Sequence, residues 1–182
     1  MKRIEAVFID RDGTVGGTGH FIHPREFIPY SYSRDALSIL KQEGIKRYAL
    51  TNQHRISRGE ATLEDFYEEF KQFDFDDAFI CPHSSKAGCR CHKPEPGMLL
   101  EATEKHNIDL TKTCVIGDVG STDMLAAHAV GALKILVLTG WGRDSVHEYR
   151  HTWLYVEPDY ISENLLDAVH WLVQYNRCEI ER

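Results

Sequence analysis

Short apolar runs that alternate with helical patterns constrain this chain more than any other feature of its sequence. The runs expected as strands contain little polar alternation and cover residues 4–9, 46–51, 77–80, 113–118 and 133–138. The segments with helical spacing are 33–44, 62–73, 96–107, 121–131 and 162–176. Strands without polar alternation are typical of a parallel sheet with both faces covered by helices. The sequence therefore predicts an α/β fold with a mostly parallel sheet.

Polar residues at the helix ends support this assignment. Ser33 is expected to cap the first helix, and Thr62 with Asp65 gives a capping-box-like start to the second. Pro96 lies near the start of the third helix, and Gly131 closes the fourth. The segment 141–153 has no clear pattern, and we leave it without a structural assignment.

The size and charge of the chain limit its function. Its 182 residues predict a single domain, 1–182, and 42% hydrophobic residues are enough for a core. The formal net charge of -7 disfavours loose binding to nucleic acid or to an anionic membrane. No apolar run approaches the roughly 20 residues of a membrane helix, and Glu5 and Asp10 interrupt the apolar amino-terminal stretch, unlike a signal peptide. We expect a cytoplasmic protein.

Carboxylates follow two of the expected strands. Asp10 and Asp12 come directly after the first strand, Asp118 ends the fourth, and Asp123 follows in the next helix. Ligands bind beyond the carboxyl ends of parallel strands, so these groups are expected to meet. Like charges held together need a cation, and hard oxygen ligands suit Mg²⁺. The sequence predicts a magnesium site that attracts phosphate.

Hydrogen-bond donors for a phosphoryl group are expected at the same edge of the sheet. Thr51 offers a hydroxyl, Asn52 an amide and Lys93 a positive charge. Asp10 lies nearest the strand and is expected to be the nucleophile, and Asp12 in the turn is expected to be the general acid and base. The alternatives are aspartates that only cap turns, and a calcium loop. The calcium loop is disfavoured because the segment follows a strand and has Phe21 where a glutamate is needed.

A second cluster, at 81–91, contains three thiols and an imidazole. Its residues are Cys81, His83, Cys89 and Cys91, in the pattern C-x-H, five residues, C-x-C. Four such ligands match a structural zinc site with no open position. A reduced cysteine cluster or a redox pair is the alternative. Cys114 is expected in the core, and Cys178 carries no prediction.

The motifs together resemble the haloacid dehalogenase (HAD) phosphatase superfamily, subfamily IIIA. The matching segments are "FIDRDGT", "ALTNQ", "CHKPEPGML" and "VIGDVGSTD". The zinc pattern is similar to that of the subgroup with heptose bisphosphate and histidinol phosphate phosphatases. The resemblance implies a three-layer Rossmann-like fold, no large cap domain, a zinc-stapled loop and a monomer.

The resemblance also implies roles for the site residues. The transferring phosphoryl group would be held by Thr51, Asn52 and Lys93. Magnesium would be bound by Asp10, the carbonyl of Asp12, and Asp118, with Asp123 nearby. The sequence departs from the subgroup at His92, where arginine is frequent, and at Arg55, where a small residue is usual. The spacing from Asp118 to Asp123 is one residue longer than in the heptose enzymes.

Specificity is expected in three loops, because neither expected insertion point has room for a large cap. The candidates are His20, His23, Arg55, Arg58, Lys86, Arg90 and His92. We expect a Mg²⁺-dependent phosphatase of a small phosphomonoester, such as a sugar phosphate in carbohydrate metabolism, acting through an aspartyl-phosphate. The alternatives are a histidinol-phosphate phosphatase, a non-catalytic phosphate-binding module, and a redox or zinc-handling protein.

Overall fold

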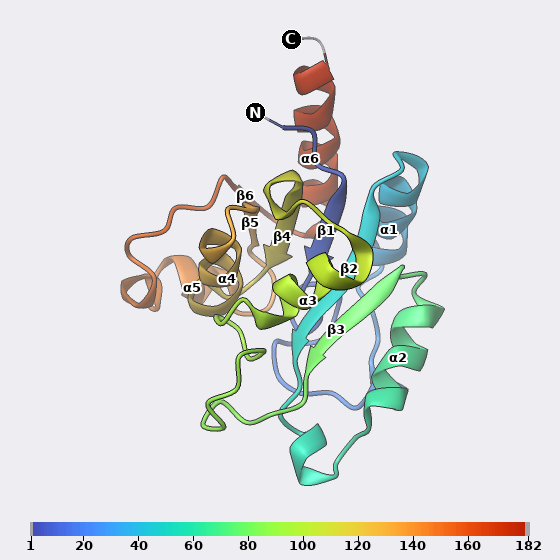
Figure 1. Ribbon diagram of the computed structural model, residues 1–182, viewed down its shortest axis with the longest axis vertical. Coiled ribbons are helices and arrows are strands. Elements are labelled where there is room, and N and C mark those ends of the chain that lie inside the picture. Colours follow the sequence, from blue (N-terminus) through green and yellow to red (C-terminus); the bar gives the residue numbers. More distant parts are fainter. Residues whose placement is uncertain (1, 181–182) are drawn as a thin grey trace.

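The computed structural model describes residues 2–180 and contains a six-stranded sheet flanked by helices (Figure 1). The strands are β1 (Ala6–Ile9), β2 (Lys46–Asn52), β3 (Asp77–Cys81), β4 (Thr113–Gly117), β5 (Leu133–Val137) and β6 (Tyr160–Ser162). The helices are α1 (Ser33–Gln42), α2 (Leu63–Gln72), α3 (Gly97–His106), α4 (Leu125–Ala129), α5 (Gly142–Val146) and α6 (Leu165–Ile180). The order across the sheet is β3-β2-β1-β4-β5-β6, with every pairing parallel.

The sheet is covered on both faces, as the unbroken apolar strands predict. Val7 and Ile9 of β1 point to the face packed by α1, α2 and α6. Ala6 and Phe8 point to the opposite face, which packs against α3 and α4. The fold is therefore three-layered and Rossmann-like. In Figure 1, β1 enters the sheet at the end where α6 finishes, so the carboxyl ends of the strands lie at the opposite end.

The strand order places a topological switch point in the middle of the sheet. The chain moves from β1 outward to β2 and β3, and then returns to β4 on the other side of β1. The loops after β1 and β4 therefore diverge, which leaves a crevice at their carboxyl ends. The segments that begin with Asp10 and Asp118 both start there. The loop from Asp10 to α1 contains a single turn of 3-10 helix (Pro24–Glu26) and no cap domain in the part of the chain described.

Some local expectations need correction. Ser33 is not the cap of α1: Tyr32 takes that position, and the Ser33 hydroxyl donates to the carbonyl of Val15 at 2.7 Å. The capping box of Thr62 and Asp65 is confirmed. The helix expected at 121–131 begins instead with one π-helical turn (Gly120–Met124) that continues into α4.

Two elements of the fold were not predicted from the sequence. The sheet has a sixth strand, β6, which is three residues long and lies at the edge. The unassigned segment 141–153 forms the short helix α5 and a 3-10 turn (Arg150–Thr152). Within residues 2–180, none of the helices combines the length and the apolar character needed to cross a membrane.

Candidate active site

Three carboxylates gather at the switch point. Asp10 follows β1, Asp118 follows β4, and Asp123 lies in the π-helical turn. One oxygen from each lies within 4.8 Å of the others. All three residues are buried, with 9% of Asp10, 0% of Asp118 and 1% of Asp123 exposed. The topology therefore brings together, at one point, carboxylates more than a hundred residues apart in the sequence.

Lys93 is the positive charge in this cluster. Its Nζ lies 2.9 Å from Asp10 Oδ1 and 2.6 Å from Asp123 Oδ1, and it also donates to the Leu50 carbonyl at 2.7 Å. Burial opposes the charged form of Lys93, but attraction by the two carboxylates raises its pKa above the usual range. If all three carboxylates are ionised, they and the Lys93 ammonium together carry an excess of two negative charges. A divalent cation would neutralise this excess.

Asp118 shows where such a cation would bind. Its Oδ2 accepts a hydrogen bond from the Trp141 backbone N–H at 2.7 Å. Its Oδ1 is buried and has no hydrogen-bond partner among the described residues. Burial, followed by repulsion from Asp10 and Asp123, raises the pKa of Asp118 well above its usual value. An unpartnered buried oxygen beside two further carboxylates fits the oxygen-rich ligand set of Mg²⁺.

Two glycines make room for this carboxylate. A Cβ atom at Gly13 would lie 2.2 Å from Asp118 Oδ2, and one at Gly140 would lie 2.1 Å from the same atom. Both glycines also have positive φ, of 88° and 55°. Only glycine allows both the close approach to Asp118 and the positive φ without displacing the carboxylate. The position of the carboxylate therefore depends on the loops after β1 and β5.

Asp12 lies beside the acidic cluster and is held on both of its oxygens. Arg11 Nη1 donates to Oδ1 and Gln53 Nε2 donates to Oδ2, each at 2.6 Å. Burial raises the pKa of Asp12 to about 6, although the Arg11 charge opposes this shift. A carboxyl group with this pKa can exchange a proton near neutral pH. The Asp12 side chain is not part of the three-carboxylate cluster, so its predicted role in metal binding concerns only its carbonyl.

The side chains that follow β2 stabilise the site from another direction. Gln53 Nε2 bridges Asp12 and the Thr51 hydroxyl, which is 2.9 Å away. Asn52 Oδ1 accepts from the Lys93 backbone N–H at 3.0 Å, and its Nδ2 donates to the Lys93 carbonyl at 3.1 Å. Asn52 therefore fixes the backbone that presents Lys93. Its predicted phosphate contact stays a prediction, as does that of Thr51.

Most of the predicted site residues line a single cavity of about 180 Å³. Its predicted members are Asp10, Asp12, Thr51, Asn52, Lys93 and Asp118. Asp123 lies behind the cavity, paired with Lys93. The specificity candidates Arg55 and His92 are not among the described residues of its lining. Arg55 pairs with Glu60 at 2.8 Å, and His92 contacts Asn52 Nδ2 at 3.3 Å.

The cysteine cluster forms next to β3. The Cys81 sulfur lies 3.2 Å from that of Cys91 and 3.7 Å from that of Cys89, and His83 Nδ1 lies 3.2 Å from Cys91 and 3.6 Å from Cys81. A tetrahedral zinc ion gives sulfur–sulfur separations of about 3.8 Å and sulfur–nitrogen separations of about 3.5 Å. All five cysteines are free of disulfides. The four side chains thus fit a zinc ion, and Cys114 is buried as expected.

Several residues of the site were not predicted from the sequence. Gln53 directly follows Asn52 and Arg11 lies between Asp10 and Asp12, but neither position alone predicts a role. Trp141 acts through its backbone N–H, which no side-chain pattern reveals. Glu69 of α2 pairs with Arg11 across 58 residues of sequence, and only its place on the buried face of that helix could have indicated it.

Comparison with known proteins agrees with this geometry. A family model described as HAD-hydrolase-like matches residues 90–168. The D-glycero-beta-D-manno-heptose-1,7-bisphosphate 7-phosphatase of Escherichia coli K12 is 36% identical over 159 residues, which cover 76% of this chain and 82% of that protein. The protein of the same name from Neisseria meningitidis serogroup B is 29% identical, with 95% of this chain and 97% of that protein covered.

A solved structure extends the similarity to the whole fold. The crystal structure of the D,D-heptose bisphosphate phosphatase from B. bronchiseptica, complexed with magnesium and phosphate, superposes with a TM-score of 0.81. The two chains are 28% identical, and the match covers 94% of this chain and 99% of the other. Fold, ordered motifs and relatives agree, and the chain therefore belongs to the HAD family of hydrolases, as one of its phosphatases.

Proposed function

We propose that Asp10 is the nucleophile of this phosphatase and that its substrate is a small sugar phosphate. The observation that carries the proposal is the buried Asp10 carboxylate, held by Lys93 at 2.9 Å beside Asp118 and Asp123. Asp12 lies two residues away at the same cavity, with both oxygens fixed. A nucleophile and a proton donor thus face one space, as transfer through a covalent intermediate requires.

The metal expected at this site is Mg²⁺. Asp10, Asp118 and the carbonyl of Asp12 would hold it, with Asp123 nearby. When bound, it neutralises charge on the phosphoryl oxygens and on the carboxylates. The unpartnered Oδ1 of Asp118 and the excess of negative charge support this assignment.

In the first step, a carboxylate oxygen of Asp10 attacks phosphorus, and the bond from phosphorus to the ester oxygen breaks. The leaving oxygen takes a proton from Asp12, so the alcohol departs neutral. Lys93 contacts Asp10 Oδ1 and fixes the rotation of the carboxylate. The products of this step are the alcohol and an aspartyl-phosphate at position 10.

In the second step, Asp12 removes a proton from water, and the water oxygen attacks phosphorus. The bond between phosphorus and Asp10 breaks, which releases inorganic phosphate and restores the carboxylate. Gln53 and Arg11 keep the two Asp12 oxygens in place throughout. The cycle consumes one water and needs no oxidant or reductant.

The substrate class is taken from the relatives and from the cavity. The relatives from Escherichia coli and Neisseria meningitidis are named as phosphatases of a heptose bisphosphate. The cavity of about 180 Å³ is lined by the candidate catalytic residues together with Gly19, Phe21 and His54, so it would take the phosphoryl group and the adjoining part of a small substrate. A small phosphorylated metabolite is therefore the proposed partner.

The zinc cluster has a structural role in this proposal. Its four ligands would fill the coordination sphere and leave no position for substrate. It joins the end of β3 at Cys81 to Cys91, two residues before Lys93. Zinc would therefore fix the loop that presents Lys93 to Asp10. We also propose that the protein acts as a monomer in the cytoplasm, which light scattering and fractionation would test.

The test is phosphate release from a panel of phosphate esters and one acyl phosphate, measured with Mg²⁺ and with EDTA. The panel contains acetyl phosphate, hexose monophosphates, a hexose bisphosphate and histidinol phosphate. We expect turnover only with Mg²⁺ and a preference for a sugar phosphate. Preference for histidinol phosphate would replace the substrate assignment. Binding of Mg²⁺ without turnover of any ester would contradict the catalytic proposal and leave a phosphate-binding module.

A further inference from the structure

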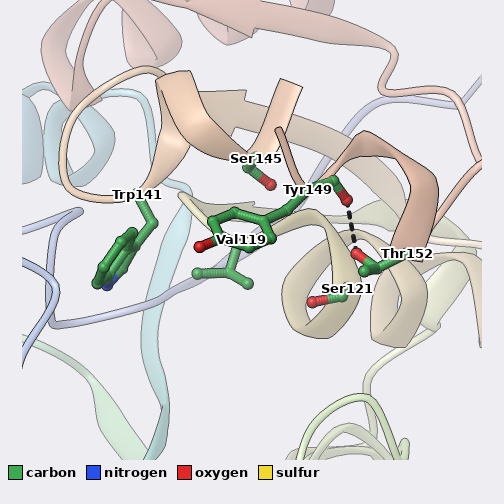
Figure 2. Close-up of a pocket in the computed structure, with 6 residues that line it drawn as sticks. All are labelled: Val119, Ser121, Trp141, Ser145, Tyr149 and Thr152. Carbon is green, nitrogen blue, oxygen red and sulfur yellow. Dashed lines mark hydrogen bonds between the residues drawn. The ribbon is translucent and has the colours of Figure 1, made fainter. Parts of the chain in front are cut away.

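The segment 141–153, which had no assignment from sequence, forms the wall of a second pocket. The pocket has a volume of about 310 Å³ and lies between α5 with its following turn and the π-helical turn after β4. Its lining residues are Val119, Ser121, Trp141, Ser145, Tyr149 and Thr152. Figure 2 shows the Tyr149 ring extending across this space, with its hydroxyl on the side of Trp141.

The walls of this pocket are fixed by specific contacts. A Cβ atom at Gly120 would lie 2.0 Å from the Trp153 ring, so the tryptophan packs directly on the glycine backbone. The Gly120 N–H donates to the Ser145 hydroxyl at 2.7 Å, and Trp153 Nε1 donates to the Ser145 carbonyl at 3.0 Å. Trp153 is only 2% exposed. The segment is therefore docked on the turn in a defined position.

The turn that follows Asp118 is π-helical. The Leu125 N–H donates to the Gly120 carbonyl, five residues earlier, which is the hydrogen bond of a π-helix. Such turns are frequent at functional sites. This turn carries Asp123 into the acidic cluster and Ser121 into the pocket.

The pocket adjoins the candidate active site. Val119 lines both the pocket and the catalytic cavity. The Trp141 backbone N–H donates to Asp118 Oδ2 at 2.7 Å, and its indole Nε1 donates to the carbonyl of Gly19, which lines the catalytic cavity, at 3.3 Å. A group attached to a phosphate in the cavity thus has a neighbouring space bounded by Trp141.

The chemistry of the lining selects an uncharged group with hydroxyls. Two aromatic rings, a valine and four hydroxyl groups line the pocket, and none of these described lining residues carries a charge. Among the described residues, the hydroxyls of Ser121 and Tyr149 have no hydrogen-bond partner. Aromatic faces bind apolar C–H surfaces, and the hydroxyls can bond to a ligand. A second phosphate would find no cation in this lining.

We propose that this pocket binds the leaving group of the substrate and that this group is an uncharged sugar ring. The inference rests on the proposed function, because the phosphoryl end must lie at Asp10. It specifies a sugar monophosphate, with the ring against Trp141 and Tyr149 and its hydroxyls near Ser121. A sugar with a second phosphate on this ring is disfavoured, since the described lining offers that anion no positively charged partner.

The test compares kcat/KM for a sugar monophosphate, the matching bisphosphate and acetyl phosphate, which is too small to reach the pocket. Tyr149→Ala removes one wall, and Thr152→Trp fills the space. Glu148→Ala is the control, because Glu148 is exposed and does not line the pocket. We expect both pocket variants to lose about tenfold or more on the sugar monophosphate and to stay within about twofold on acetyl phosphate. The control should match the wild type on both.

A binding measurement supplies a readout without turnover. In an Asp10→Asn background, titration with the sugar monophosphate should change tryptophan fluorescence, because Trp141 lines the pocket and Trp153 supports it. The addition of Tyr149→Ala should weaken this binding by about tenfold. Inorganic phosphate alone should bind both backgrounds equally.

The outcomes separate the two proposals. Absence of Mg²⁺-dependent hydrolysis of every ester and of acetyl phosphate would reject the proposed function, and the pocket inference with it. Hydrolysis of acetyl phosphate with no effect of the pocket variants on the sugar phosphate would reject the pocket inference alone. Equal losses on both substrates, or a higher kcat/KM for the bisphosphate, would also overturn it.

Discussion

Arg11 and Glu69 form a buried ion pair directly behind Asp12. Nε and Nη2 of Arg11 donate to the two oxygens of Glu69, each at 2.7 Å, and the residues are 0% and 4% exposed. The guanidinium also lies 3.8 Å from the centre of the Phe27 ring and donates to Asp12 Oδ1 at 2.6 Å. Helix α2, which carries Glu69, is thereby connected to the proposed acid and base.

Glu69→Gln should destabilise the protein by roughly 3 kcal/mol, because the buried Arg11 charge loses its bidentate partner. Urea unfolding measures this change. The control is Glu68→Gln on the exposed side of the same helix, where we expect a change of at most about 0.5 kcal/mol. Equal changes in the free energy of unfolding for the two substitutions would show that the Arg11–Glu69 pair does not stabilise the fold.

Glu69→Gln should also reduce kcat/KM, and the reduction should be larger for a substrate whose leaving group needs a proton. An alkyl phosphate needs a proton from Asp12, whereas p-nitrophenolate leaves without one. Because Arg11 loses its anchor, we expect kcat/KM for glycerol phosphate to fall at least about tenfold more than for p-nitrophenyl phosphate. A parallel loss on both substrates would indicate a purely structural role for the pair.

Gly140→Ala should disturb the metal site through Asp118. The new Cβ would lie 2.1 Å from Asp118 Oδ2, so the carboxylate has to move. We expect kcat to fall roughly a hundredfold and Mg²⁺ binding to weaken, since displacements of about 1 Å have effects of this size.

Gly44→Ala is the matched control for this substitution. Gly44 also has positive φ, of 70°, but nothing lies within 4 Å of its added Cβ. Both variants should lose about 1–2 kcal/mol of stability from backbone strain, and Gly44→Ala should keep its activity within about twofold. Steady-state kinetics and urea unfolding of both proteins separate strain from displacement of Asp118. Equal kcat values for Gly140→Ala and Gly44→Ala would contradict the claim that Gly140 makes room for Asp118.

Removal of one thiol from the cysteine cluster should release zinc and destabilise the protein together. We expect the wild type to contain one zinc per chain and Cys89→Ser to contain none, with a Tm lower by about 5 °C or more. Cys178→Ser, at an exposed cysteine outside the cluster, should change neither quantity. Elemental analysis and thermal melting measure both. An unchanged Tm without zinc would exclude a structural zinc site.

The strands of the sheet could be predicted from the sequence because buried parallel strands are apolar throughout. Each of the five expected strands is present within a residue or two of its predicted bounds. Strand β6 was missed because it is three residues long and only Ser162 within it is buried. Ser33 was misassigned because its hydroxyl bonds to Val15, a contact that depends on the folded loop after β1.

The carboxylates of the candidate site could be anticipated because strand order carries them to one edge. The contacts that orient them could not. Gln53 and Glu69 act through side chains from different elements, and Trp141 acts through its backbone. Such contacts depend on packing between segments, which a linear pattern of residue types does not encode.

Trapping of the covalent intermediate tests the central claim most directly. The enzyme would be mixed with a sugar phosphate and Mg²⁺, quenched with borohydride and digested, since borohydride reduces an aspartyl-phosphate to homoserine. We predict homoserine at position 10 alone in the wild type, and neither homoserine nor phosphate release in Asp10→Asn. Turnover that persists in Asp10→Asn, or homoserine at any other position, would contradict the assignment of Asp10 as the nucleophile.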